Sequence, residues 1–250
     1  MSDGFDLVRP ELGVPGLRIV STTRTGGVSV GGRASLNLAM HVGDEPVAVA
    51  ENRRRLRSAA ALPSEPLWLE QVHGRNVAVH EGRVDRVPRA DAAVAFEPGR
   101  VCVVMTADCL PVVLADRAGT RVGIAHAGWR GLAGGVVEAT VAALGVPGTE
   151  LVAWLGPAIG PQAFEVGPEV HDTFVSADPR AASCFTVNGR GRQQADLQGL
   201  ARLALGRLDV EVAGACTDCT WSDPVRYFSH RRDPGSGRQA TLAWLERGPC

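Results

Sequence analysis

The residues best suited to chemistry in this sequence are His73, Cys109 and His126. Each ends or follows a short apolar run, which places it at a strand end or in a turn. A thiolate and two imidazoles suit Zn²⁺ and leave its fourth coordination position open for water or substrate. An open position is typical of catalytic zinc. Because the spacing of the three residues matches no compact zinc motif, ordinary packing roles are the alternative.

Two charged residues flank these ligands in the sequence. Asp108 directly precedes Cys109, and its carboxylate is expected to act as a general acid or base. Arg130 follows His126 and carries a planar guanidinium that suits phosphate or carboxylate. We therefore expect Arg130 to contact an anion in the reaction, although a surface ion pair is the commoner fate of a single arginine.

The same residues allow two interpretations other than zinc catalysis. Without a metal, Cys109 beside His73 or His126 would form a Cys–His nucleophilic pair, and the protein would be a cysteine hydrolase acting on amides. The third interpretation is a zinc-stabilised interaction module without catalysis. The open coordination position argues against that module.

Two further motifs lack the context that their chemistry needs. The segment Gly27–Gly31 matches G-x-S-x-G, but no helical pattern follows it, so it is predicted to be a turn and not a nucleophile elbow. Cys216 and Cys219 form a single C-x-x-C, and no second pair completes a zinc site. These two thiols are predicted to be partly buried and structural.

The composition excludes several classes of enzyme and partner. The chain has 250 residues, and its 26 basic residues are all arginine because it contains no lysine. Schiff-base enzymes, pyridoxal-phosphate enzymes, P-loop nucleotide binders and protein kinases each need a lysine amine and are excluded. The net charge of −1 provides no basic field for a nucleic acid.

The sequence also predicts where the protein is found. It shows no secretion signal and no apolar run that approaches a membrane span, so we expect a cytoplasmic protein without a membrane partner. In a reducing cytoplasm, metal binding or catalysis is expected of the six cysteines before disulfides. No protein partner can be inferred from the sequence.

Short strands alternating with a few helices must position these residues. Helices are predicted where good helix formers carry periodic apolar residues, at 46–62, 131–144 and 194–208. Strands are predicted over β-branched runs, at 17–23, 67–72, 76–80, 101–106, 112–115, 121–125, 151–155 and 241–245. Because no linker or repeat divides the chain, we expect a single α/β domain over residues 1–250, with its core at about 17–246.

Seven motifs, in order along nearly the whole chain, resemble those of one known family. They are TTRTGGVS, SLNLAMHVGD, LEQVHG, MTADCLPV, IAHAGWRG, GPAIGP and YFSHRRD. By these motifs the chain is identified as a member of the YfiH-type family, which is also named the polyphenol oxidoreductase laccase-domain family, the purine nucleoside phosphorylase family and peptidoglycan editing factor. His230 and Gln239 depart from the Tyr and Met common there, and neither is a proposed ligand.

The resemblance implies a fold and a metal site. The fold is α/β with mixed β-sheets flanked by helices, similar to the catalytic fold of cytotoxic necrotizing factor. The zinc ligands implied are the His of QVH, the Cys of ADC and the His of AHAGWRG, which in this sequence are His73, Cys109 and His126. This set agrees with the one that residue chemistry selects.

The resemblance also implies a reaction. It is zinc-dependent phosphorolysis of adenosine, inosine, guanosine and methylthioadenosine, with adenosine deamination as a side activity. Phosphorolysis needs a site for phosphate and stabilisation of the negative charge that develops on the departing purine. Arg24, Arg130 and Arg231 are candidates for the phosphate, and Asn37 is a candidate for contacts with the ribose or base. Purine nucleosides and phosphate are therefore the expected partners.

The other names of the family imply other reactions. Peptidoglycan editing, which removes a wrong amino acid from a precursor, agrees with the cysteine hydrolase interpretation. Copper oxidation of polyphenols is disfavoured, because four coppers need about ten histidines and paired H-x-H motifs. This chain has six histidines and no H-x-H.

Overall fold

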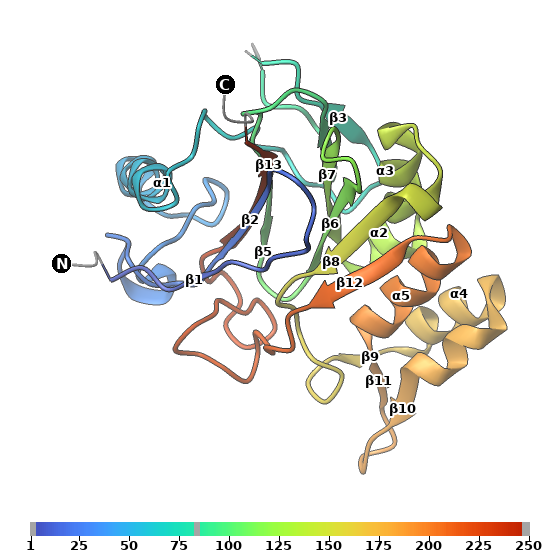
Figure 1. Ribbon diagram of the computed structural model, residues 1–250. Coiled ribbons are helices and arrows are strands. Elements are labelled where there is room, and N and C mark those ends of the chain that lie inside the picture. The colour runs from blue at the N-terminus through green and yellow to red at the C-terminus, as the bar shows by residue number, and fades with distance from the viewer. Residues whose placement is uncertain (1–3, 83–85, 247–250) are drawn as a thin grey trace.

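Two β-sheets lie face to face at the centre of the molecule, with helices outside them (Figure 1). The computed structural model describes residues 4–82 and 86–246. The ends of the predicted domain, residues 1–3 and 247–250, and with them Cys250, lie outside the described residues. The successive layers are α1 (Pro46–Ala59), a four-stranded sheet, a six-stranded sheet and a group of helices. This arrangement confirms the expected α/β fold with mixed sheets flanked by helices.

The six-stranded sheet is mixed. Its strands follow the order β12 (Glu211–Ala215), β8 (Leu151–Leu155), β6 (Leu110–Asp116), β7 (Val122–Ala127), β4 (Ala92–Ala95) and β3 (Val77–Val79). The two outer pairs, β12 with β8 and β3 with β4, are parallel, and the inner pairs are antiparallel. The four central strands are buried at every residue, because helices cover one face and the other sheet covers the second.

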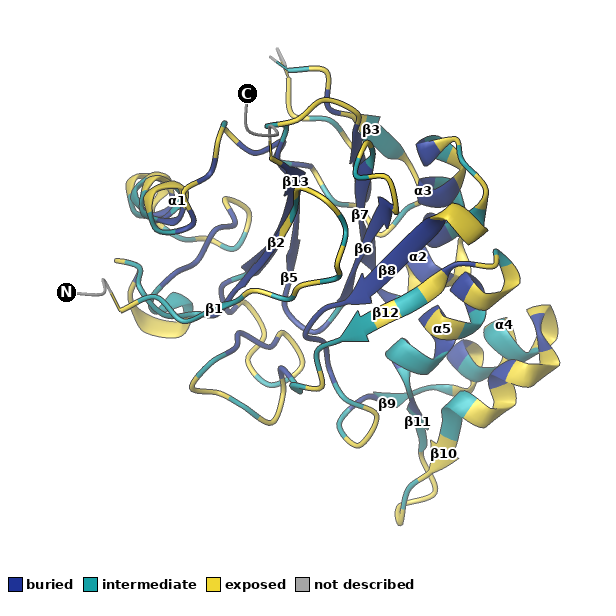
Figure 2. Ribbon diagram, viewed as in Figure 1, coloured by how far each residue is buried: buried dark blue, intermediate teal, exposed yellow. Residues whose placement is uncertain are grey.

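The four-stranded sheet is antiparallel. Its strands follow the order β1 (Leu7–Val8), β2 (Leu17–Thr22), β13 (Gln239–Leu245) and β5 (Cys102–Thr106). Side chains on one face, such as Val104, pack against Ile124 and Trp154 of the six-stranded sheet. Those on the other face, such as Leu242, pack toward Leu56 of α1. Figure 2 shows that the buried residues concentrate in these two sheets and at the inner faces of the helices.

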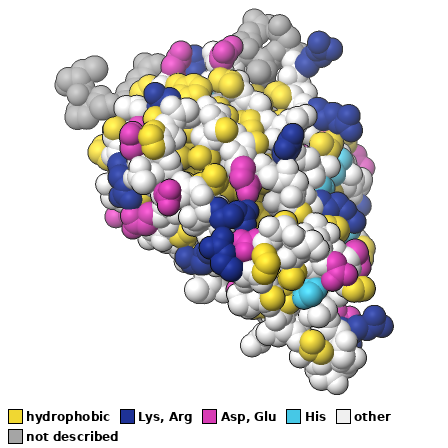
Figure 3. Space-filling model, turned by 90° about the vertical axis from the view of Figure 1, so that its right-hand side faces the viewer, with side chains coloured by type: hydrophobic (Ala, Val, Ile, Leu, Met, Phe, Trp, Pro, Cys, Tyr) yellow, Lys and Arg dark blue, Asp and Glu magenta, His cyan; other side chains and the backbone are white. Residues whose placement is uncertain are grey.

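The helices beside the six-stranded sheet are α2 (Trp129–Ala133), α3 (Val136–Leu144), α4 (Pro168–Ala177) and α5 (Leu197–Arg207). A small sheet of β10 (Phe185–Val187), β11 (Gln193–Ala195) and β9 (Glu165–Val166) lies next to α4 and α5. On the face that Figure 3 shows, basic side chains lie beside acidic ones. Arg207 pairs with both Asp178 and Glu138. Among the described residues, none of the helices has the length and apolar character needed to cross a membrane.

Three elements differ from those predicted. The predicted helix 131–144 is broken in two, because Gly134 and Gly135 separate α2 from α3 and Gly135 adopts a φ of +85°. The predicted strand 67–72 forms only isolated bridges. The predicted helix 194–208 begins later, at Leu197, because Asp196 caps it by accepting a hydrogen bond from the N–H of Gly199 at 2.9 Å.

A short link between the two sheets positions the candidate site. β5 belongs to the four-stranded sheet and β6 to the six-stranded sheet, and only Ala107, Asp108 and Cys109 join them. Asp108 adopts a φ of +92°, which a non-glycine residue rarely does, and the chain turns sharply there. β7 ends beside the start of β6, where Ala127 pairs with Leu110. The ends of three strands thus meet at one edge of the sheets.

Candidate metal-binding active site

His73, Cys109 and His126 come together at this edge although they are far apart in the sequence. Their potential ligand atoms all lie within 4.8 Å of one another. The Sγ of Cys109 is 3.8 Å from the Nε2 of His73, and the two imidazole rings stand edge to face with their centroids 4.7 Å apart. Three donor atoms this close together could hold a metal ion.

A buried carboxylate, that of Asp91, orients His126. Asp91 directly precedes β4, and its Oδ1 lies 2.9 Å from the Nδ1 of His126. Neither side chain is more than 5% exposed to solvent. The contact leaves the Nε2 of His126 available on the opposite side of the ring. A carboxylate that orients an imidazole in this way is typical of histidine ligands of metals.

The same carboxylate shapes the turn that carries His73. It accepts hydrogen bonds from three consecutive backbone N–H groups, those of Val72 at 3.2 Å, His73 at 2.9 Å and Gly74 at 2.7 Å. His73 adopts a φ of +58°, which is costly for a residue with a side chain, and these hydrogen bonds hold it there. Asp91 therefore fixes two of the three potential ligands at once. Burial alone would raise the pKa of Asp91, but the hydrogen bonds from His126 and Gly74 lower it.

Cys109 is held by the link between β5 and β6. The carboxylate of Asp108, the preceding residue, accepts hydrogen bonds from the hydroxyls of Thr220 at 2.7 Å and Ser229 at 3.0 Å and from the N–H of Arg231 at 2.7 Å. These contacts tie the link to residues 216–238, the long irregular segment between β12 and β13. That segment therefore lies against the site.

The backbone at Gly128 passes so close to the Cys109 thiol that only a glycine fits there. A Cβ atom at Gly128 would stand 2.7 Å from the Sγ of Cys109 and 3.1 Å from the Cδ2 of His73. Gly128 comes directly after β7 and begins α2, so it separates His126 from the helix that carries Arg130. A side chain at this position would push two of the potential ligands apart.

The surroundings of Cys109 favour its thiolate form. Burial would raise the pKa of the thiol, but the neighbouring imidazoles of His126 and His73 lower it to about 6. For His126, burial acts to lower the pKa, and the charges of Cys109 and Asp91 outweigh this effect and raise it to about 9. A thiolate is the form of cysteine that binds metals and attacks electrophiles.

Two cavities meet at His73 and Cys109, and His126 lines the first of them. The first, which we call the polar cavity, has a volume of about 300 Å³, and beside the ligands its lining includes His41, Gln71, Arg130, His230 and Arg238. The second, which we call the apolar cavity, has a volume of about 140 Å³, and its lining includes Trp129, Ile159, Phe164 and Leu197. His73, Cys109 and Arg130 line both cavities. A ligand that spans the two would pass directly over the potential metal site.

Some of the catalytic and substrate-binding residues expected from the sequence lie at these cavities. Arg130 lines both cavities, with its guanidinium 4.4 Å from the centroid of the neighbouring Trp129 ring. Asp108 and Arg231 line the apolar cavity. Arg231 also donates a hydrogen bond to the carbonyl of Glu165 at 2.7 Å.

Arg24 and Asn37, which the sequence also suggests as substrate-binding residues, line neither cavity. The guanidinium of Arg24 donates to the carbonyls of Ala34 at 2.8 Å and Pro224 at 2.9 Å. Asn37 is fully buried, and its side chain accepts a hydrogen bond from the N–H of Arg238 at 3.0 Å. Both side chains bind other parts of the chain in this structure.

Sequence reasoning missed four residues of the site. Asp91 carries no motif, and its role depends on contacts that only the fold creates. Gln71 stands next to the predicted ligand in LEQVHG, and its amide bonds both the N–H and the carbonyl of Met105 at 2.8 Å. His230 and Arg238 come from the irregular segment 216–238. A clue was available for His230, which belongs to YFSHRRD, one of the motifs of the resemblance.

The two motifs set aside in the sequence behave as predicted. Gly27–Gly31 contains no strand–helix junction, and the hydroxyl of Ser29 is buried and donates to Asp44 at 2.6 Å. Cys216 and Cys219 are partly buried and free, and the Sγ of Cys219 accepts a hydrogen bond from the N–H of Gly160 at 3.1 Å. The predicted turn and the predicted partial burial of the two thiols are confirmed.

A comparison with known families and proteins agrees with this geometry. Residues 18–246 match the model of a family described as multi-copper polyphenol oxidoreductase laccase. The chain belongs to this laccase-domain family. The resemblance noted in the sequence is confirmed, because relatives named YfiH match nearly the whole chain.

Curated relatives in the laccase-domain family carry the name of an enzyme. A Pseudomonas aeruginosa protein named purine nucleoside phosphorylase is 54% identical over 231 residues, which cover 92% of this chain and 94% of the relative. The Escherichia coli K12 protein named purine nucleoside phosphorylase YfiH is 48% identical over 240 residues, which cover 96% of this chain and 98% of the relative. A solved Neisseria meningitidis structure matches with a TM-score of 0.92 and 46% identity, over 96% of this chain and 99% of that one.

Proposed function

We propose that this protein is a zinc-dependent purine nucleoside phosphorylase that accepts adenosine, inosine, guanosine and methylthioadenosine and deaminates adenosine as a side activity. The observation that carries the proposal is the junction of the two cavities, where His73 and Cys109 line both. One cavity is rich in basic side chains and the other is apolar, as a phosphate and a purine would need. The name of the relatives supports the same assignment.

The donor set fits zinc. Zinc binds thiolates at about 2.3 Å and imidazoles at about 2.0 Å, so a tetrahedral ion sets a thiolate sulfur and an imidazole nitrogen roughly 3.5 Å apart. The distance of 3.8 Å between the Sγ of Cys109 and the Nε2 of His73 is close to this value. His73, Cys109 and His126 would hold the ion and leave one position open. When bound, zinc would supply Lewis acidity that polarises substrate oxygens and makes water more acidic.

In phosphorolysis, an oxygen of hydrogen phosphate forms a bond to C1′ of the ribose, and the bond from C1′ to N9 of the purine breaks. The bonding electrons leave with the purine, which takes up the proton of the phosphate. The chain must therefore hold the phosphate and stabilise the charge on the purine. Arg130 lines both cavities and stands where it would contact the anion. In deamination, water adds to C6 of adenosine and ammonia leaves.

For Asp108 we propose the role of general acid or base, because it lines the apolar cavity next to Cys109. Its three hydrogen bonds, from Thr220, Ser229 and Arg231, support a second role in holding the segment 216–238. The variant Asp108→Asn separates the two. A variant that lowers kcat and alters the pH profile at unchanged thermal stability indicates proton transfer. A variant that loses stability, with the pH profile unchanged, indicates positioning alone.

The experiment that tests the proposed function incubates zinc-loaded protein with adenosine, with and without phosphate. We expect ribose 1-phosphate only when phosphate is present, and inosine in both cases. Removal of zinc with a chelator is expected to abolish both products, and re-addition of zinc to restore them. If neither product forms at any zinc content, the proposal is refuted.

A second candidate function, amide hydrolysis by Cys109, is favoured by one observation. Cys109, His126 and Asp91 lie in the order of a nucleophile, its base and a carboxylate that orients the base. Such an enzyme would act on amides in peptidoglycan precursors without a metal. A thiol-alkylating reagent would block it and a chelator would not, whereas we expect activity to depend on the metal.

Copper oxidation of polyphenols is the activity that the family description names. The described residues place three or more potential ligands together only once, in the cluster of His73, Cys109 and His126. A site for four coppers would need many more histidines, and the chain has six in total. The ligand count therefore favours the nucleoside reaction over copper oxidation.

A further inference from the structure

We infer that the polar cavity is the phosphate subsite, that Arg238 is its principal anion-binding residue together with Arg130, and that the apolar cavity takes the purine. This inference rests on the proposed function and adds to it the place of each substrate. The sequence had offered Arg24, Arg130 and Arg231 for the phosphate. Of these only Arg130 lines the polar cavity.

Arg238 is held rigidly at the wall of the polar cavity. It directly precedes β13, and its Nη1 donates to the carbonyls of Ser236 at 2.7 Å and Gly237 at 3.0 Å. These bonds fix one edge of the guanidinium against its own backbone. The remaining N–H groups of the planar fork have the geometry to bind a phosphate.

Asn37 holds the backbone of the same residue. Its Oδ1 accepts the N–H of Arg238 at 3.0 Å, and the N–H of Leu38 donates to the carbonyl of Arg238 at 3.2 Å. The Nδ2 of Asn37 is bound in turn to the carboxylate of Asp44 at 2.8 Å. The motif SLNLAMHVGD therefore supports the proposed anion site through the backbone of Arg238 and not through contact with the anion. Asn37 is in this view a positioning residue for Arg238 and does not touch the substrate.

No carboxylate forms an ion pair with Arg238 in the described part of the chain. Among the residues that the structure describes, neither Arg238 nor Arg130 forms an ion pair, and no aspartate or glutamate lines the polar cavity. Burial lowers the pKa of Arg238, and the nearby negative charges of Cys109 and Asp108 offset this effect only in part. A cation in such a place gains much from a bound anion.

A hydroxyl group at the polar cavity has no hydrogen-bond partner among the described residues. The hydroxyl of Thr106, at the end of β5, is buried and has no hydrogen-bond partner within the described ranges. Buried hydroxyls are almost always hydrogen-bonded in folded proteins. Thr106 lines the polar cavity together with the two arginines. A phosphate held by the two arginines would bring oxygen acceptors to the wall of the cavity that contains this hydroxyl.

The apolar cavity has the opposite character. Its wall combines two aromatic side chains, Trp129 and Phe164, with Ile159 and Leu197. A purine is flat, and its faces gain binding energy from stacking on aromatic rings. The cavity is also bordered by Arg231, whose guanidinium lies 5.4 Å from the centroid of the Phe164 ring. The ribose, between base and phosphate, would then lie at the potential metal ligands.

The test compares steady-state kinetics of the zinc-loaded wild type with the variant Arg238→Gln. Loss of charge-assisted hydrogen bonds is expected to raise the KM for phosphate roughly 10- to 100-fold. The KM for the nucleoside is expected to rise far less. Conversely, Phe164→Leu should raise the KM for the nucleoside more than that for phosphate. The matched control Arg57→Gln removes the same charge from an exposed position of α1 and should change neither value.

Two further measurements keep the inference testable. If Arg238→Gln does not fold, Arg238→Lys retains the charge, and its loss of the fork should still raise the KM for phosphate severalfold. Unfolding curves and zinc content establish that each variant is intact. An unchanged KM for phosphate in an intact Arg238 variant overturns the inference, while the phosphorylase activity of the wild type stands.

The anion subsite can also be tested if the protein proves not to be a phosphorylase. If the wild type forms no ribose 1-phosphate, the binding of inorganic phosphate is measured by calorimetry. Binding to the wild type that is weakened at least tenfold in the Arg238 variant supports the anion subsite by itself. Equal binding to both proteins, or no binding to the wild type, refutes it.

Discussion

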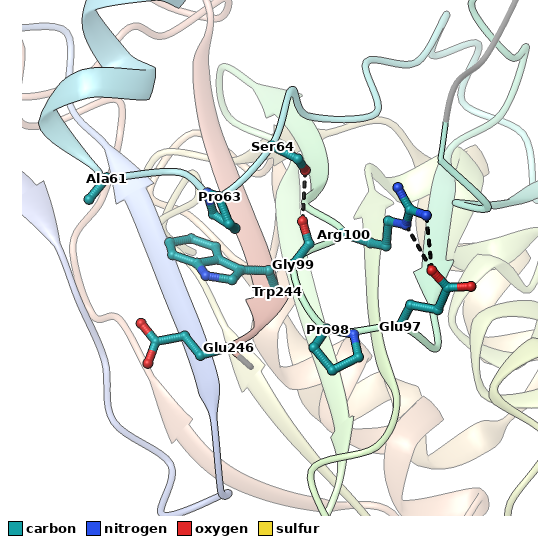
Figure 4. A pocket seen from close by; sticks show the side chains of 9 residues that line it. All are labelled: Ala61, Pro63, Ser64, Glu97, Pro98, Gly99, Arg100, Trp244 and Glu246. Carbon is teal, nitrogen blue, oxygen red and sulfur yellow. Dashed lines mark hydrogen bonds and ion pairs between the residues drawn. The ribbon is translucent and has the colours of Figure 1, made fainter. Parts of the chain in front are cut away.

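Two cavity regions of this molecule differ in what their charged side chains do. The larger cavity, of about 560 Å³, lies beside the four-stranded sheet and is lined by residues such as Pro63 and Trp244 (Figure 4). Its charged groups bind one another or nearby residues. Arg100 turns toward Glu97 and pairs with it at 2.9 Å, and Glu246 pairs with Arg18 at 2.8 Å.

The cavities at the edge of the two sheets are smaller, yet their polar groups point to a ligand. Arg130 and Arg238 lack ion pairs among the described residues, and Thr106 has a buried hydroxyl without a partner there. Three metal-binding side chains converge at the same place. Cavity volume therefore does not identify a functional site in this protein. Charged side chains without ion pairs and converging metal-binding side chains identify the site instead.

The largest expected effect tests the centre of that comparison. The variant His126→Ala removes one of three ligands, and we expect it to lower zinc occupancy and to reduce nucleoside turnover by more than about 100-fold, since loss of supporting partners alone can cost that much. Metal analysis and product formation measure the two effects. The control is His171→Ala, which removes an imidazole from α4. A His126 variant with full zinc and full activity would contradict the assignment of the site.

The second prediction concerns two His–carboxylate pairs, one in each environment. The buried pair of His126 and Asp91 has the same kind of contact, 2.9 Å long, as the exposed pair of His171 and Asp172, at 3.0 Å. We expect Asp91→Asn to weaken zinc binding about 10- to 100-fold, because the amide no longer orients the ligand as the carboxylate does. Asp172→Asn should leave zinc binding unchanged. Competition with a chelator measures both affinities, and equal values would remove the proposed role of Asp91.

These two pairs also show how far the sequence alone could predict the site. His126 was found because an imidazole after an apolar strand is a recognisable ligand signal. Asp91 was not, because a carboxylate gains its role only when β4 and β7 pair and bring it to the ring. Arg238 was missed for a similar reason, since the segment 216–238 has no periodicity from which its path could be predicted.

The fold was predictable to a similar degree. Strand β8 has a continuous apolar sequence and β13 a mostly apolar one, and their predicted ranges agree closely with the structure. The sequence did not predict β4, whose four residues are mostly alanine, because alanine has low strand propensity and pairing with neighbours creates this strand. Helix α4 was missed as well, since only Val170 among its residues is fully buried and the apolar pattern is weak.

A third prediction concerns the space around the potential ligands. In Gly128→Ala the new Cβ would stand 2.7 Å from the Sγ of Cys109, so the thiol must move. We expect kcat/KM for the nucleoside to fall about tenfold, since small displacements of reacting groups are costly. Gly206→Ala on α5 is the matched control, because its Cβ would meet nothing within 4 Å. That variant should gain about 0.5–1 kcal/mol in the free energy of unfolding at unchanged activity. A fully active Gly128 variant would mean that the ligands tolerate rearrangement.

The smallest expected effect is at the larger cavity, where the charges are already paired. Arg100→Gln breaks the ion pair with Glu97, whose side chain is 67% exposed, and surface pairs contribute at most about 1 kcal/mol to the free energy of unfolding. We expect a change within that limit in chemical unfolding and no change in the KM for phosphate or nucleoside. The same removal of charge at Arg238 should raise the KM for phosphate at least tenfold. If Arg100→Gln impairs turnover as strongly, the larger cavity takes part in the reaction, and the distinction between paired and unbalanced charge fails for this protein.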